Sequence, residues 1–314
     1  MQVNLTAYLL FMAAGALLCS LLFFLLLRAK EGISASRALG LAGTALLLAV
    51  PLGILGAKLL YFLFRFSYIL SQGAGKFFGS LKPEELSYYG GAAGVCLAVF
   101  LAARIFRYSP AAALNAFAAP GALMAGLARF AEYWLGYLGT GDYLEQALPF
   151  PFAVSEAWNP DFPEYYLAVF MLEGLLSVRI AFFAFGERKN RFCFLRTVFY
   201  LCLIQVLCES LRAQSIRWLF VRYEQLLCFL IAEGILVFWA IRGRKSGKRA
   251  WTAAAAGLAV CAFTILLEFM LDGKITLGEA GLPPLVLYGL MAWGLFELGA
   301  AEKRVVRRLE GSLP

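Results

Sequence analysis

The chain has 314 residues, of which 62% are hydrophobic and 15% are charged, and its formal net charge is +8 at pH 7. A soluble globular domain is about half apolar and about a quarter charged, so this composition excludes an ordinary soluble enzyme and indicates one integral membrane domain. The absence of histidine excludes Ser-His-Asp, Cys-His and histidine–metal chemistry. The basic residues lie in short loops between apolar stretches, as membrane anchors do, which argues against nucleic-acid binding.

Apolar stretches of about 20 residues predict membrane-spanning helices. On that basis we expect an all-α polytopic membrane protein with nine spans, at 5–27, 39–64, 88–106, 112–138, 163–185, 194–211, 222–241, 250–271 and 283–299. Pro51 and Pro120 fall inside spans and are expected to kink them.

The loop charges predict the orientation. No Lys or Arg precedes the first apolar run, whereas Arg28, Lys30 and Arg37 follow it, so this run is not expected to be a cleaved signal peptide. Most other Lys and Arg residues also follow the odd-numbered spans. The positive-inside rule then places the N-terminus outside and the C-terminus in the cytoplasm.

Two loops divide the chain. The segment 139–162 has no Lys or Arg but carries several carboxylates, prolines and aromatic residues, and we expect it to form an external cap at the membrane interface. The basic segment 242–249 is expected in the cytoplasm. It separates a seven-helix domain, 1–241, from a two-helix extension within 242–314.

The seven cysteines form no C-x-x-C pair and lie mostly in apolar segments, where cysteine acts as a small hydrophobe. We therefore expect neither a disulfide framework nor a metal site. No cofactor is indicated.

Charges inside the predicted spans are the main functional candidates, because each costs at least about 2.5–3.5 kcal/mol near the bilayer centre. They are Lys58, Arg129, Glu132, Glu173, Arg179, Glu209, Glu233, Glu268 and Glu297, with Arg212 near the end of a span. Arg129 and Glu132 share a helix face at i, i+3, and Glu209 and Arg212 repeat that spacing in reverse order. The pairs either hold helices together structurally or enclose a polar cavity.

The segment Ser87-Tyr88-Tyr89-Gly90-Gly91 opens the third span. Small residues allow helices to approach closely, so this segment serves either helix packing or a lipid-headgroup cleft with tyrosine hydroxyls at its mouth.

The order of these features over residues 5–241 resembles the prolipoprotein diacylglyceryl transferase family. The resemblance rests on Tyr8 with Gly15 in the first span, Gly56-Ala57-Lys58 through Tyr61, Tyr89-Gly90-Gly91, the run from Ala119-Pro120-Gly121 to Arg129, Gln205 with Glu209 and Arg212, and Glu224-Gln225. The seven-helix topology of that family, with its N-terminus outside, agrees with the loop charges.

Three positions depart from the family pattern. Tyr89 replaces the histidine of its H-G-G motif, Glu132 replaces an asparagine, and Gln205 replaces the first arginine of its late R-x-x-x-E-x-x-R motif. Three outcomes follow: a divergent transferase, a relative with a different lipid or acceptor, or an inactive relative.

The resemblance implies transfer of a diacylglyceryl group from phosphatidylglycerol to a cysteine thiol in the signal peptide of a lipoprotein precursor, in a bacterial plasma (inner) membrane. Arg129 would hold the lipid phosphate with support from Arg212, because guanidinium groups donate paired hydrogen bonds to phosphate. Glu209 and Glu132 would orient the arginines or accept the thiol proton. Substrate-binding roles would fall to Tyr8, Tyr61, Tyr89, Gly90, Gly91, Gln205 and Gln225.

Two other functions remain open. A membrane scaffold or lipid-binding subunit would explain the altered motif positions. A secondary transporter would need broken helices at matching places in two halves, but Pro51 and Pro120 are not symmetrically placed and the sequence shows no internal repeat.

Overall fold

The computed structural model describes residues 3–29, 33–146, 148–156, 164–213, 215–218, 221–242, 248–275 and 281–311. It divides into two compact units, Met1–Thr197 and Val198–Pro314. The boundary between them falls within helix α8 along the chain. The predicted domain boundary at residue 241 comes one helix later, and that division stays a prediction.

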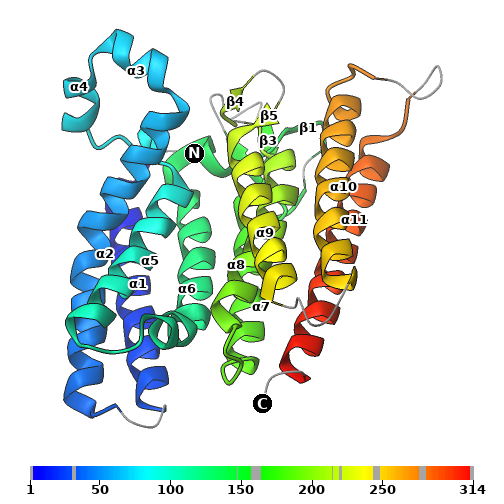
Figure 1. Ribbon diagram of the computed structural model, residues 1–314. Helices are drawn as coiled ribbons and strands as arrows, with labels where there is room; N and C mark the ends of the chain where they lie inside the picture. Colours follow the sequence, from blue (N-terminus) through cyan, green and yellow to red (C-terminus); the bar gives the residue numbers. More distant parts are fainter. Residues whose placement is uncertain are drawn as a thin grey trace. The chain divides into compact units, whose positions relative to one another are not determined.

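The first unit contains α1 (Leu5–Arg28), α2 (Ala35–Phe64), α3 (Phe66–Gln72), α4 (Ala74–Gly79), η1 (Pro83–Glu85), α5 (Tyr88–Ile105), α6 (Pro110–Ala131), η2 (Glu132–Gly139) and α7 (Val169–Gly186), and the start of α8 (Cys193–Leu211) (Figure 1). Asn4, Ser34, Ser87 and Ser109 accept backbone N–H bonds at the starts of α1, α2, α5 and α6, which explains where these helices begin.

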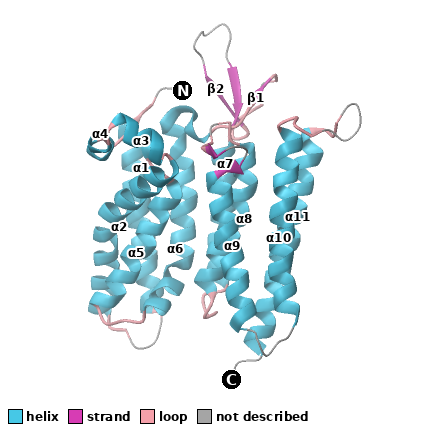
Figure 2. Ribbon diagram, turned by 45° about the horizontal axis from the view of Figure 1, so that its top comes forward, coloured by secondary structure: helices cyan, strands magenta, loops and turns pink. Residues whose placement is uncertain are grey.

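The predicted cap loop, 139–162, holds two strands of a small antiparallel sheet, and the third strand follows the loop. Strands β1 (Tyr143–Leu144), β2 (Ala153–Glu156) and β3 (Glu164–Leu167) lie in the order β1-β3-β2. Tyr166 is the register partner of both Tyr143 and Val154. Figure 2 shows the strands beyond the start of α7, and we call this the strand-bearing end of the first unit. It is also the end at which α1 and α5 begin and α2 and α6 terminate.

The second unit contains the rest of α8, then β4 (Arg217–Trp218), β5 (Val221–Arg222), α9 (Tyr223–Arg242), α10 (Lys248–Leu271) and α11 (Pro284–Gly311). β4 and β5 form a short hairpin, with Arg217 opposite Arg222. Within this unit α10 packs against both α9 and α11.

Within the described ranges, nine helices are long and apolar enough to cross a membrane, so the chain is an all-helical, multi-pass membrane protein apart from its short strands. The nine predicted spans each match one of these helices. The fifth begins at Val169 rather than residue 163, because 164–167 pair with 153–156 as strands. The fourth changes at Glu132 to a 3₁₀ segment with Gly136 at φ +78°, and α11 continues past residue 299 to Gly311.

Glycines set the closest helix contacts of the first unit. A Cβ on Gly90 would lie 2.2 Å from the carbonyl oxygen of Gly56, and a Cβ on Gly94 would lie 2.1 Å from that of Leu52. The backbones of α2 and α5 therefore touch at positions where only glycine fits.

Candidate functional site

The charged centre of the first unit is Arg129, near the end of α6. Its side chain is 2% exposed. Nε donates to Glu173 on α7, and Nη1 donates to Glu132, one turn further along the chain. The guanidinium carbon lies 3.6 Å from the centre of the Tyr88 ring on α5. Arg129 thus joins three elements at the strand-bearing end of the unit, and its i, i+3 pairing with Glu132 is present as predicted.

Two further predicted residues lie within electrostatic range of this centre. The Tyr8 hydroxyl of α1 interacts electrostatically with both Glu132 and Arg129. Tyr89 interacts electrostatically with Arg129, and its ring centre lies 5.2 Å from that of Tyr88. The structure therefore brings together Tyr8, Tyr89, Arg129 and Glu132, and adds Glu173 and Tyr88, which were not predicted as site residues.

Arg129 is shared between two carboxylates. Its guanidinium faces both Glu132 and Glu173. An anionic ligand would have to compete with both carboxylates for Arg129.

Tyr61 belongs to a different cluster of the first unit. Its ring stacks on Phe77 at 5.8 Å, close to Lys58. The Lys58 Nζ donates to Phe77 O at 3.1 Å, Ser80 Oγ at 3.4 Å and Glu85 Oε2 at 2.8 Å, so all three ammonium hydrogens have acceptors. Lys58 thereby fixes the segment from α3 to η1 against α2.

The carboxylate of Glu85 lies outside the spans and depends on this cluster. Hydrogen bonds from Lys58 and then from Ser80 hold the pKa of Glu85 below its ordinary value. Both donors favour the ionised form. Lys58, an intramembrane charge in the sequence, thus has a structural partner.

Gly90 and Gly91 differ in their surroundings. Gly90 faces the backbone of Gly56. Of the two roles that the sequence left open for this segment, helix packing and lipid binding, Gly90 therefore has the first. A Cβ on Gly91 would lie 3.7 Å from its nearest neighbour, the carbonyl oxygen of Gly53, an ordinary contact. Lipid binding by either glycine stays a prediction.

In the second unit, Gln205, Glu209 and Arg212 lie along one face near the end of α8. Gln205 Nε2 donates to Glu209 Oε2 at 3.1 Å, and Arg212 Nε lies 3.9 Å from the same oxygen. All three residues are buried. The predicted Glu209–Arg212 pair is present but long, and Gln205 is the closer partner of the carboxylate.

Arg222 holds the end of α8 in place. Its Nη1 donates to the backbone oxygens of Glu209 at 2.6 Å and Arg212 at 2.8 Å, and Nη2 donates to that of Ser210 at 3.3 Å. A helix leaves its last carbonyl groups without intrahelical partners, and a cation there satisfies them. Arg222, at the end of β5, is therefore the C-terminal cap of α8.

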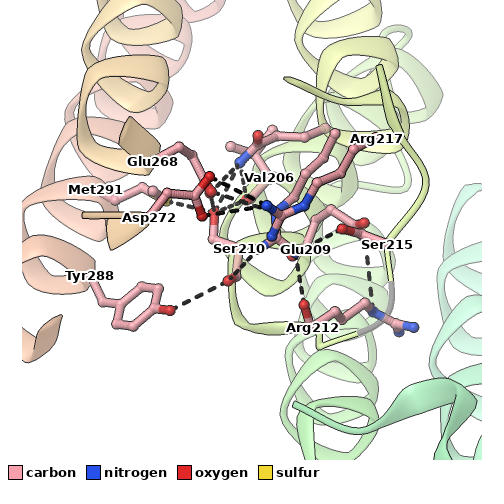
Figure 3. Close-up of polar contacts among 12 residues, drawn as sticks. Val206, Glu209, Ser210, Arg212, Ser215, Arg217, Glu268, Asp272, Tyr288 and Met291 are labelled. Carbon is pink, nitrogen blue, oxygen red and sulfur yellow. Dashed lines mark hydrogen bonds and ion pairs between the residues drawn. The ribbon is translucent and has the colours of Figure 1, made fainter. Parts of the chain in front are cut away.

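Glu268 of α10 closes this network (Figure 3). Its Oε1 accepts hydrogen bonds from Ser210 Oγ and, at 3.2 Å, from Gln225 Nε2, and its Oε2 lies 3.5 Å from Arg222 Nε. Gln225 also donates to Ser210 Oγ at 2.9 Å. The predicted residue Gln225 thus lies with Ser210 and Glu268 rather than bonding directly to Glu209.

Five residues of these networks were not predicted as site residues: Tyr88, Glu173, Ser210, Arg222 and Glu268. Tyr88 lies in the tyrosine–glycine segment that the sequence singled out. Glu173 and Glu268 carried a signal as charges inside predicted spans. Ser210 and Arg222 carried none, because their contacts depend on how α8, the β4–β5 hairpin and α10 pack.

Comparison with known proteins assigns the family. Residues 1–241 match the family model described as prolipoprotein diacylglyceryl transferase. No curated protein and no solved structure matches the chain. The matched segment covers well over half of the sequence and ends with α9, so this chain belongs to the prolipoprotein diacylglyceryl transferase family.

Proposed function

We propose that this protein transfers a diacylglyceryl group from phosphatidylglycerol to the cysteine thiol of a lipoprotein precursor. The location proposed is the outer leaflet of a bacterial plasma membrane, with the N-terminus outside. Family membership supports the reaction class. The single structural observation that carries the proposal is a buried arginine between two glutamates and under a tyrosine ring at the end where α1 begins.

The reaction needs no nucleophile from the protein. The cysteine sulfur of the precursor attacks the glycerol carbon of the diacylglyceryl group, a C–S bond forms, and the C–O bond to phosphate breaks. Glycerol phosphate leaves with the bonding electrons, and the thiol proton passes to a base. An unperturbed thiol has a pKa near 8.5, so a nearby base and cation are needed at neutral pH.

Glu132 and Arg129 are proposed to act together in this step. When Glu132 takes the thiol proton, it loses the charge that holds Arg129 Nη1. That N–H can then donate to the departing phosphate, whose charge is growing at the same moment. Glu173 keeps Nε in place throughout, so the guanidinium turns toward the phosphate without leaving its site.

Tyr8 and Tyr89 are proposed to donate to headgroup oxygens. With no histidine in the chain, proton transfer falls to carboxylates, and Tyr89 can take over only the hydrogen-bonding part of the role of the family histidine. Tyr61, Gly90 and Gly91 are proposed as weaker contacts with the lipid.

Arg212 is proposed as a second phosphate-binding arginine, with Glu209 orienting it. Arg212 Nε lies 3.9 Å from Glu209 Oε2, close enough for the carboxylate to orient the guanidinium. Gln205 donates a hydrogen bond that holds the Glu209 carboxylate in place. Gln225 donates one to the hydroxyl of Ser210 in the adjoining turn.

The test uses purified full-length protein in phosphatidylglycerol vesicles with a peptide that carries the precursor cysteine. Mass spectrometry reads the peptide and the released glycerol phosphate. The expected result is a thioether adduct of diacylglyceryl mass together with glycerol phosphate. A Cys→Ser peptide is the control. Folded protein that forms no adduct with any anionic or zwitterionic phospholipid would contradict the proposal.

A non-catalytic lipid-binding or scaffold subunit is the second candidate. The observation that favours it is the pairing of Arg129 with two carboxylates, which is also what a structural charge cluster needs. In that case vesicle lipid would be retained by the protein, but no peptide adduct would form.

A further inference from the structure

Glu268 lies outside the segment that matches the family, yet it contacts three residues within it. The matched segment ends at residue 241, and Glu268 belongs to α10. It contacts Ser210 of α8, Arg222 of β5 and Gln225 of α9. The α10–α11 pair therefore contributes a charged side chain to the polar network at the end of α8.

Glu268 supplies a counter-charge to the buried guanidinium of Arg222. Arg222 is 6% exposed, and its hydrogen bonds go to backbone carbonyl oxygens and the Ser215 hydroxyl, all uncharged. Besides Glu268, Asp272 also interacts electrostatically with Arg222, but Glu268 is the carboxylate in direct contact with it. A buried cation is costly without a counter-charge. The Glu268 carboxylate, itself 8% exposed, lies 3.5 Å from Arg222 Nε and supplies that charge.

The network connects Glu268 to the family motif through the backbone. Arg222 Nη1 bonds to the carbonyl oxygens of Glu209 and Arg212, so the position of its guanidinium sets the last turn of α8. That turn determines where the side chains of Glu209 and Arg212 lie. A shift of Arg222 would be transmitted to both.

Other contacts hold α10 and α11 along the same unit. Asp272 pairs with Arg217 at 3.3 Å, one turn beyond Glu268. The Tyr288 hydroxyl donates to the Ser210 carbonyl oxygen at 3.4 Å. Toward the other end of α8, Tyr200 donates to Glu302 at 3.0 Å. Residues of both α10 and α11 thus hold this helix pair against α8 and the β4–β5 hairpin.

We propose that Glu268 is a positioning residue for lipid transfer: it fixes Arg222, and through Arg222 it fixes the turn that presents Glu209 and Arg212. The inference rests on the proposed function. The C-terminal helices α10 and α11 are then required for full transferase activity, because the segment that matches the family does not include Glu268.

The experiment compares Glu268→Gln and Glu268→Asp with a control in the same helix pair, Glu297→Gln. Glu297 has 52% of its side chain exposed and only a 4.0 Å contact with Arg304. The transfer assay gives kcat and KM for the peptide. Glu268→Gln is expected to lower kcat about ten- to hundredfold, the scale of a misplaced catalytic group, with little change in KM. Glu268→Asp restores part of kcat, and Glu297→Gln matches the parent.

A merely structural role predicts a different pattern. In that case kcat per folded molecule stays at the parent value in both Glu268 variants, which overturns the proposal. If Glu268→Gln does not fold, Glu268→Asp decides: kcat between about a tenth and a half of the parent supports positioning, and parent kcat contradicts it.

Amide hydrogen exchange separates this inference from the proposed function. Exchange at residues 209–213 and 215–218 is expected to rise in folded Glu268→Gln but not in Glu297→Gln. Parent protein that transfers no lipid overturns the proposed function, and the positioning proposal with it, even where exchange rises. Unchanged exchange in folded Glu268→Gln contradicts the positioning proposal even where the parent is active.

Discussion

Arg129 on α6 donates from Nε to Glu173 on α7, and this contact ties the end of one helix to the start of the next. The two residues lie 44 positions apart. Gly126 and Gly174 lie beside this contact, where a Cβ on Gly126 would approach the Gly174 carbonyl oxygen to 2.9 Å. Close approach of the two helices is what lets the side chains meet.

Removing the arginine should leave the buried carboxylate of Glu173 and the half-buried one of Glu132 without the cation that they share. Arg129→Gln is therefore expected to lower the stability of the first unit by about 3–5 kcal/mol, and Arg129→Gln/Glu173→Gln to recover part of that loss. Buried cysteines report unfolding directly: thermal reaction of Cys19 and Cys193 with a thiol dye measures it. Equal melting of the single and double variants would show that the pair is not coupled.

The two neighbouring glycines of α5 offer a matched pair. Gly90→Ala places a methyl group 2.2 Å from a backbone oxygen of α2, whereas Gly91→Ala meets only ordinary contacts. Overpacking of this kind costs about 1–3 kcal/mol or more, so Gly90→Ala should melt earlier and Gly91→Ala should not. Reduced transfer by stable Gly91→Ala would support the predicted lipid contact there. Equal melting of the two variants would contradict the helix contact described.

The Lys58–Glu85 contact predicts a pH dependence for the segment from α3 to η1. The pKa of Glu85 is lowered in the folded state by Lys58 and then Ser80. Its contribution to stability is therefore complete above the unfolded pKa of about 4.3 and is lost as pH falls through the folded pKa. Amide protection factors at residues 66–71 and 76–86, corrected for intrinsic exchange, should decline below about pH 4.

The matched variants are Glu85→Gln and Glu84→Gln. Glu84 is exposed and neighbours Glu85 in η1. Glu85→Gln should remove the pH dependence, and Glu84→Gln should leave it intact. A pH response that survives in Glu85→Gln would assign the effect to another group.

Substitution of the two arginines of the β4–β5 hairpin should lower the folding stability by very different amounts. Arg222→Gln removes the cap of α8 and leaves Glu268 without its counter-charge, so a loss of about 3–5 kcal/mol is expected. Arg217 is 39% exposed and pairs with Asp272 at 3.3 Å, a surface contact that contributes about 0–1 kcal/mol. Chemical unfolding of the two variants, followed by reaction of Cys202, Cys208 and Cys228, measures the difference. Similar losses in both would contradict the capping role of Arg222.

Hydropathy alone located the membrane helices, because a bilayer demands long apolar segments whatever their neighbours are. It placed the start of the fifth span too early, because apolar residues of β3 continue directly into α7. The Arg129–Glu132 pair could be predicted from its i, i+3 spacing.

Contacts between distant segments could not be predicted in this way. Glu173 and Glu268 stood out as charges in apolar segments, but their partners depend on which helices pack together. Arg222, at the start of the seventh predicted span, was not singled out in the sequence, and only the folded hairpin places it over the carbonyl groups of α8. The two readings of the Gly90 region were open in the sequence because helix packing and lipid approach both require small residues.

The most direct test of the account is the transfer assay on Arg129→Lys beside the parent. Lysine keeps the positive charge between Glu132 and Glu173 but lacks the planar fork that can bond a phosphate while still holding a carboxylate. We expect Arg129→Lys to melt like the parent and to lose at least about hundredfold in adduct formation, the scale of one lost charge-stabilising donor. Adduct formation at the parent rate by folded Arg129→Lys would contradict the assignment of Arg129 as the phosphate-binding residue.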